Sequence, residues 1–105
     1  MPKAKRGEIW LIDLGLMQKT RPCLVLNIDY LDHKRAVVTY IPRTTHLRGT
    51  RFEVPHQGRG FQPGAFDPQG IGSIPEVKLE MRLGVLEPTI LQQVEGALKR
   101  WLALT

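Results

Sequence analysis

Two segments of the sequence place cationic and hydroxyl side chains at the ends of apolar runs. Arg21 precedes the apolar run 23–26, while Thr44 and Thr45 follow the apolar run 36–41. A guanidinium beside hydroxyl donors, held on rigid strands, suits the stabilisation of negative charge that develops on a phosphate as RNA is cleaved. The residue types therefore make RNA cleavage the leading hypothesis.

The length and charge of the chain agree with such a substrate. With 105 residues, the chain is long enough for one domain, and we expect a single domain over residues 1–105. Hydrophobic residues make up 42% and charged residues 24%, which is typical of globular proteins and disfavours disorder. The net charge of +5 favours a polyanionic partner, either nucleic acid or an acidic protein. A role in solubility alone stays open.

Cysteine content and hydropathy bear on the compartment. The single cysteine, Cys23, excludes an intrachain disulfide, and its apolar surroundings are typical of a buried thiol. No apolar stretch approaches the ~20 residues of a membrane span. The basic start at residues 1–6 is not followed by the apolar segment of a secretory signal. We expect a cytoplasmic protein without membrane association.

The hydrophobic pattern predicts short strands and one helix. We expect strands at 8–14, 21–28, 35–41, 51–54 and 80–86, a turn at 29–34, and two short extended pieces near 64–66 and 71–74 within the irregular region 57–75. Pro88 suits the first position of a helix. The helix carries an apolar stripe that should face the core or, in part, another subunit: Ile90, Leu91, Val94, Leu98, Trp101 and Leu102. This order predicts a small, curled, mainly antiparallel sheet or barrel with a C-terminal helix.

Several other chemistries lack their sequence signatures. One cysteine and three dispersed histidines, His33, His46 and His56, do not give a zinc spacing. The glycine-rich region lacks the Gly-Lys-Ser/Thr ending of a phosphate-binding loop, and no serine lies in an elbow motif. We therefore expect no metal and no cofactor.

Four segments together carry a family resemblance. Residues 6–11 read RGEIWL, residues 20–26 read TRPCLVL, residues 37–45 read VVTYIPRTT and residues 52–54 read FEV, with weaker similarity at 69–73 and 82–86. In this order and spacing the chain resembles the MazF/PemK toxin endoribonucleases, the toxin half of type II toxin–antitoxin pairs. The resemblance covers essentially the whole chain.

The resemblance implies a fold, an activity and partners. The fold would be the SH3-like small barrel of the CcdB/MazF/PemK-like toxins, assembled as a homodimer. The activity would be metal-independent cleavage of single-stranded RNA, including mRNA, by attack of the ribose 2′-OH, which leaves a 2′,3′-cyclic phosphate and a 5′-OH. A cognate, acidic antitoxin would bind the same groove as the RNA.

The resemblance also assigns site residues. The catalytic arginine and threonine of the family correspond to Arg21 and Thr44. Many members carry a carboxylate in the first loop, but residues 15–20 contain none. His46 is the local substitute as acid or base, since strand alternation would place it on the face of Thr44; a role as a surface-loop histidine is the alternative.

Further residues are candidates for RNA contact, on the basis of charge and of the family pattern: Lys19, Arg43, Thr45, Arg48, Arg51 and Gln69. For the arginines, the alternative is a solvated charged face. A second function also stays open at this level. The chain could be a catalytically silent barrel that acts by binding, as a topoisomerase poison or as a nucleic-acid- or protein-binding module.

Overall fold

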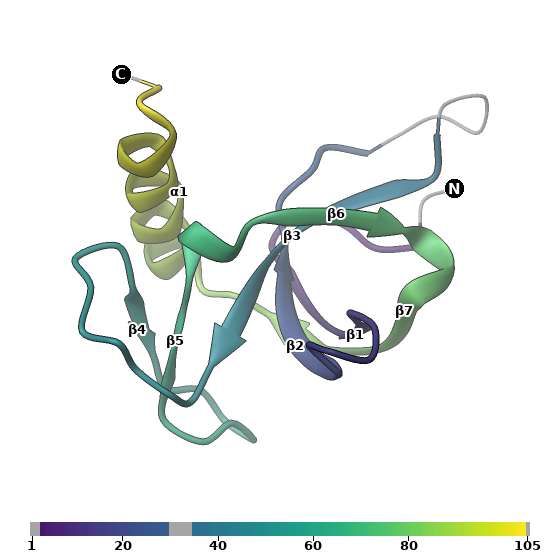
Figure 1. Cartoon of the computed structure of the whole chain (residues 1–105), viewed down its shortest axis with the longest axis horizontal. Helices are drawn as coiled ribbons and strands as arrows, with labels where there is room; N and C mark the ends of the chain where they lie inside the picture. Colours follow the sequence, from purple (N-terminus) through teal and green to yellow (C-terminus); the bar gives the residue numbers. More distant parts are fainter. Residues whose placement is uncertain (1–2, 30–34, 105) are drawn as a thin grey trace.

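The computed structural model describes residues 3–29 and 35–104. The turn expected at 29–34, apart from Asp29, and His33 lie outside the described residues. The elements, in chain order, are β1 (Glu8–Asp13), β2 (Thr20–Val25), β3 (Val37–Thr44), β4 (Val54–His56), β5 (Gly64–Phe66), the 3₁₀ turn η1 (Pro68–Gly70), β6 (Gly72–Pro75), the 3₁₀ turn η2 (Glu76–Lys78), β7 (Leu79–Val85) and α1 (Pro88–Leu102) (Figure 1).

The strands form one antiparallel sheet in the order β4-β5-β3-β2-β1-β7. Strand β3 organises it, because β2 pairs along one edge while the other edge is shared by β6, opposite residues 37–40, and β5, opposite residues 43–44. Among the described residues no ladder joins β4 to β7, so the sheet curls like a small barrel without closing. The expected mainly β fold with a C-terminal helix is confirmed.

Strand alternation divides the core into two clusters on opposite faces of the sheet. Trp10, Cys23 and Val38 belong to the cluster inside the curl, whereas Ile9 and Leu24 belong to the cluster beneath the helix. Every one of these five side chains is buried. The two faces of the sheet therefore contribute side chains to different clusters, and alternate residues of a strand belong to alternate clusters.

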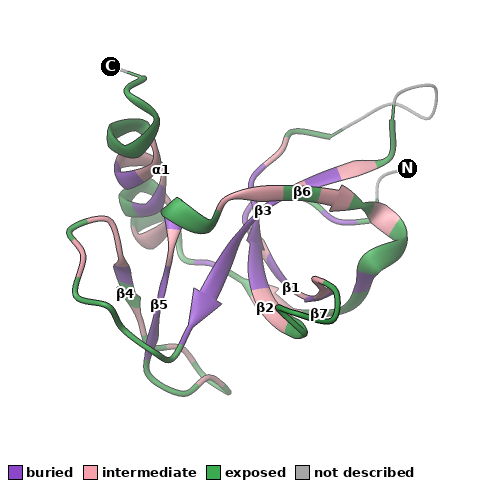
Figure 2. Cartoon of the chain, viewed as in Figure 1, coloured by how far each residue is buried: buried purple, intermediate pink, exposed green. Residues whose placement is uncertain are grey.

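Helix α1 covers the second of these clusters. Val94 and Ala97 are fully buried on its inner face, and the helix stands alongside β4, as Figure 1 shows. Figure 2 shows the buried residues as a stripe along one side of the helix. The core-facing stripe is thus confirmed over most of its length, although Trp101 and Leu102 near the C-terminal end are each 43% exposed.

Three strands differ from the sequence expectation by up to three residues, and the others by at most one. Strand β2 ends at Val25 rather than at residue 28. Strand β3 continues beyond Ile41 to Thr44, because Pro42 pairs with Cys23 of β2 and the last two residues pair with β5. The fourth strand is Val54–His56 rather than 51–54, and it contains Pro55. Proline is tolerated there because β4 is an edge strand whose outer side needs no donor.

Within the part of the chain that the structure describes, no helix is long and apolar enough to cross a membrane.

Candidate active site

Arg21 and Thr44 lie across from each other on neighbouring strands. The β2–β3 ladder pairs Cys23 with Pro42 and Val25 with Tyr40. Continuing this antiparallel register by two residues brings Arg21 opposite Thr44. Directly paired residues share a face of the sheet, so the two side chains project from the same face, at the end of the inner cluster.

The guanidinium of Arg21 is fixed by the backbone of β3. Its Nη2 donates a hydrogen bond of 3.0 Å to the carbonyl oxygen of Arg43. Among the described residues this is the single hydrogen bond that the Arg21 side chain makes, so most of its five N–H donors remain for a ligand. The side chain is half-buried and lines the cleft described below.

Thr44 ends β3 with a local hydrogen-bonded turn. Its Oγ1 accepts a hydrogen bond of 3.0 Å from the backbone N–H of His46 and lies 3.3 Å from the carbonyl oxygen of His46, to which it donates. Hydroxyl side chains commonly bond to the backbone two residues ahead in such turns. The short bond holds the oxygen, while the long one leaves the hydroxyl proton easy to redirect to a stronger acceptor.

These residues share a cleft of about 450 Å³ at the end of the sheet where β3 stops and β2 begins. Its lining brings together five of the predicted site residues with Arg21: Arg43, Thr44, Thr45, His46 and Arg48. The β1–β2 hairpin contributes Met17 and Gln18, which the sequence reasoning missed. Met17 is 95% exposed, and an apolar side chain in a polar hairpin was the available signal.

His46 reaches the cleft by a different route from the one expected. Because β3 ends at Thr44, His46 lies in the bend that follows, and strand alternation does not place it. Its backbone N–H is held by Thr44 instead, and its exposed side chain lines the cleft. His46 therefore lines the same cleft as Thr44, as expected, but the local turn places it there and not the alternation of a strand.

Two carboxylates shape the loop after His46. The N–H groups of Arg48 and Gly49 each donate a 2.9 Å hydrogen bond to the carboxylate of Glu53. The Arg48 side chain is 70% exposed, and its Nη1 lies 3.2 Å from Oδ2 of Asp67. An exposed pair of this kind contributes little energy, so Arg48 can exchange Asp67 for a phosphate at small cost.

Arg43 differs from the other arginines of the cleft in the burial of its side chain. Its side chain lies on the opposite face of β3 from Thr44 and is only 5% exposed. The guanidinium donates to Nδ1 of His56 at 2.9 Å, to the carbonyl oxygen of His56 at 2.8 Å and to the carbonyl oxygen of Gln62. Arg43 thus lines the cleft while its guanidinium is bonded within the protein, and contact of this residue with RNA stays a prediction.

Three other candidates lie outside the lining of the cleft. Lys19 is exposed in the β1–β2 turn, where it has a positive φ of 60°. Arg51 stacks on Phe52, with Cζ 4.9 Å from the ring centre. Gln69 lies in η1, where its N–H donates to the side chain of Asp67. None of the three lines the cleft, and their contact with RNA stays a prediction.

In the described part of the chain, neither a metal cluster nor a reactive thiol accompanies the site. No group of three or more His, Cys, Asp or Glu side chains within residues 3–29 and 35–104 is arranged to hold a metal ion. Burial raises the pKa of the fully buried Cys23 to about 12, so the thiol stays protonated and is a poor nucleophile.

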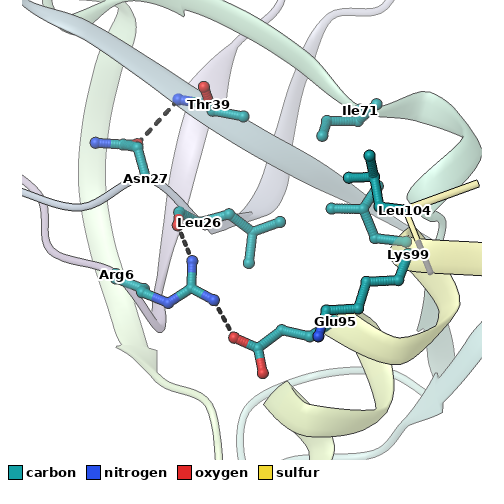
Figure 3. Close-up of a pocket in the computed structure, with 9 residues that line it drawn as sticks. Arg6, Leu26, Asn27, Thr39, Ile71, Glu95, Lys99 and Leu104 are labelled. Atoms are coloured by element: carbon teal, nitrogen blue, oxygen red, sulfur yellow. Dashed lines mark hydrogen bonds and ion pairs between the residues drawn. The ribbon is translucent and has the colours of Figure 1, made fainter. Parts of the chain in front are cut away.

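A second cavity, of about 510 Å³, lies between α1 and the ends of β2 and β3, away from these residues (Figure 3). Arg6 crosses it, donating to the carbonyl oxygen of Leu26 and pairing with Glu95 of the helix. Leu98, Leu104 and Ile71 make its wall largely apolar. None of the predicted site residues lines this cavity.

Solved structures define the class of protein to which this fold and cleft belong. A Mycobacterium tuberculosis toxin, MazF-mt6, superposes with a TM-score of 0.81 at 26% identity, over 93% of this chain and 98% of its own. An endoribonuclease from a mycobacterial species, solved in complex with its cognate antitoxin, gives 0.84 at 22% identity, over 97% of both chains. MazF from Deinococcus radiodurans gives 0.81 at 21% identity, over 95% of this chain and 96% of its own. The fold is therefore that of the MazF toxins.

Residues 5–102 match the family of PemK-like, MazF-like toxins of type II toxin–antitoxin systems. This match spans nearly the entire chain. The protein belongs to that family, and the resemblance drawn from its short motifs is confirmed.

Proposed function

We propose that this toxin is an endoribonuclease that cleaves single-stranded RNA, including mRNA, without a metal ion. The observation that carries the proposal is that Arg21 and Thr44, on the neighbouring strands β2 and β3, line one cleft together with Arg48. Names of related structures add support, since two mycobacterial relatives of the same fold are described as endoribonucleases.

The reaction is a transesterification. The 2′-oxygen of ribose forms a bond to the adjacent phosphorus and the bond from phosphorus to the 5′-oxygen breaks, leaving a 2′,3′-cyclic phosphate and a 5′-OH. The guanidinium of Arg21 donates to the nonbridging oxygens, whose charge grows in the transition state. The Thr44 hydroxyl turns from the His46 carbonyl to supply a further donor.

Two protons must move in this reaction, one from the 2′-OH and one to the 5′-oxygen. His46 is the titratable side chain that the cleft offers for them, because an imidazole accepts and donates protons near neutral pH. Its exposed position leaves its ring free to approach either oxygen.

The RNA strand would follow the cationic rim. Arg48 and Thr45, which line the cleft, would contact the phosphates next to the scissile one, and Lys19, Arg51 and Gln69 would contact flanking nucleotides. The net charge of +5 attracts both RNA and an acidic antitoxin segment, which would inhibit by occupying the same cleft. The toxin acts as a single-domain protein, residues 1–105, in a cytoplasmic homodimer.

Incubation with mixed-sequence single-stranded RNA in EDTA tests the proposal. Fragments with cyclic-phosphate and 5′-OH ends are expected from the native protein, and none from Arg21→Ala. Folded, antitoxin-free protein that leaves the RNA intact would refute it.

A further inference from the structure

Arg43 and Thr44 are neighbours in sequence and are the buried polar or charged residues of the described chain, 5% and 7% exposed respectively. They point to opposite faces of β3. Both residues line the cleft, but the guanidinium of Arg43 is directed to His56 of β4 and to Gln62. Burial of a charge is costly unless hydrogen bonds compensate, so a buried arginine beside the cleft needs a structural reason.

The Arg43 guanidinium joins three segments of chain. From β3 it donates to both the ring and the carbonyl of His56 in β4, and to the carbonyl of Gln62 in the loop that leads to β5. The ring of Phe61 packs against it, with Cζ 5.0 Å from the ring centre. Three acceptors and an aromatic face together satisfy the charge in its buried position.

Gly64 on β5 completes the enclosure. A Cβ at this position would lie 2.9 Å from Arg43 Nη1 and 2.5 Å from the carbonyl oxygen of Thr44. The β5 backbone therefore lies directly against both the side chain of Arg43 and the backbone of Thr44. A close fit of this kind restricts how far the end of β3 can move.

Arg43 also fixes Arg21, through its backbone carbonyl group. While the side chain of Arg43 is anchored in the interior, its carbonyl oxygen accepts the hydrogen bond from Arg21 Nη2. We propose that Arg43, braced by His56, is a positioning residue that holds the Arg21 guanidinium and the Thr44 hydroxyl in register with the scissile phosphate. This inference rests on the proposed ribonuclease function.

The hydrogen bonds from the Arg43 guanidinium to His56, called the brace below, require that the imidazole of His56 is neutral. Nδ1 accepts from Arg43 Nε, so it must carry a lone pair, and protonation would set two cations face to face. Arg43 of β3 and Glu87, which precedes α1, are the charged groups that act on this imidazole, while Phe61 and Phe66 pack around the ring. His56→Asn keeps an acceptor near the place of Nδ1, whereas His56→Leu removes it.

Steady-state RNA cleavage separates positioning from phosphate binding. Arg43→Met should lower kcat by about tenfold or more with KM within about twofold, since misplaced catalytic groups reduce turnover rather than affinity. Arg48→Met is the matched control on the cleft side, and there KM should rise while kcat holds. A rise in KM for Arg43→Met, like that of Arg48→Met, would overturn the inference.

The His56 pair decides the question if Arg43→Met fails to fold. His56→Asn should keep kcat within about threefold of the native protein, and His56→Leu should lose about tenfold, because only the first retains an acceptor for Arg43. Equal kcat for the two variants, each shown to be folded, would refute the brace.

A readout without activity keeps this inference distinct from the proposed function. In protein labelled with ¹⁵N-arginine, the Arg21 guanidinium should show slowed rotation of its Nη groups in the native protein and in His56→Asn, and fast rotation in His56→Leu. That result without RNA cleavage would refute the proposed function but keep the brace. If the native protein cleaves RNA but the Arg21 signals are unchanged in His56→Leu, the proposed function is supported and the brace is refuted.

Discussion

Arg21 Nη2 donates a 3.0 Å hydrogen bond to the carbonyl oxygen of Arg43, so the residue that precedes Thr44 holds the guanidinium opposite Thr44. Arg21 and Thr44 are thus fixed by strands, whereas His46 lies in the bend that follows β3. Strands give sites greater precision than loops do. The exposed segments around the cleft, the β1–β2 hairpin and the loop after Thr44, are then left to contact RNA and to set which sequences are cut.

Thr44 should be replaceable by serine but not by valine. Serine keeps the hydroxyl that bonds to His46, while valine keeps the shape and loses the donor. Loss of a transition-state donor typically costs about 10²–10³ in kcat, so we expect a loss of about 10² for Thr44→Val and less than about tenfold for Thr44→Ser. Single-turnover cleavage of a defined RNA measures both. Equal rates for the two variants would show that the hydroxyl takes no part.

His46→Gln should slow cleavage and flatten its pH profile. Glutamine retains a polar side chain in the cleft but transfers no proton at neutral pH, and general acid–base catalysis is worth about 10²–10⁴. The rate constant is measured across pH in the native protein and in the variant. If the two profiles coincide, His46 is a surface histidine, and the proton transfers belong to another group.

The stability of the protein should fall on acidification because of His56. Burial, followed by the nearby Arg43, lowers the pKa of His56 from its ordinary value of 6.5, with Glu87 opposing. Between the lowered pKa and 6.5 the unfolded chain binds more protons than the folded chain. The free energy of unfolding is therefore at its full value above this window and decreases as pH falls through it.

Urea denaturation at several pH values measures this slope. The His56→Asn variant should lose the part of the slope that falls within the window, because asparagine does not titrate. A native-like slope in that variant would mean that the acid sensitivity arises from other groups.

Gly64→Ala should destabilise the protein, whereas Gly84→Ala should not. A Cβ at Gly64 meets Thr44 O at 2.5 Å and Arg43 Nη1 at 2.9 Å, while one at Gly84 meets nothing within 4 Å. Forcing a methyl group into a packed region costs about 1–3 kcal/mol, and we expect less than about 0.5 kcal/mol at Gly84. Chemical denaturation of the two variants compares them directly. Equal stabilities would contradict the close packing of β5 on the end of β3.

Most elements follow from local patterns in the sequence, whereas the extension of β3 has a tertiary cause. The short pieces near 64–66 and 71–74 and the helix from Pro88 lie where hydrophobic periodicity and glycine or proline positions predict them. The last three residues of β3 do not look like a strand, because Pro42 and Arg43 interrupt the apolar run. Pairing with β2 and β5 extends the strand, and such tertiary pairing leaves no trace in a local window.

The candidate site could likewise be predicted only where local motifs determine it. Arg21, Thr44, His46 and Arg48 do meet in one cleft, as the motifs indicated. The burial of Arg43 was not predictable, because its acceptors lie 13 and 19 residues further along the chain and two of them are backbone carbonyls. In the sequence Arg43 resembles the neighbouring solvated arginines, and only the fold distinguishes it.

The most direct test of the account replaces a single oxygen atom in the substrate. Once the cut position in a short RNA is mapped, the nucleotide on its 5′ side is made 2′-deoxy, with every other residue left as ribose. The account predicts that the native protein cuts the all-ribose strand in EDTA and leaves the single-deoxy strand intact, because the attacking 2′-OH is gone. Cleavage of the single-deoxy strand at the same position, or no cleavage of either strand, would contradict it.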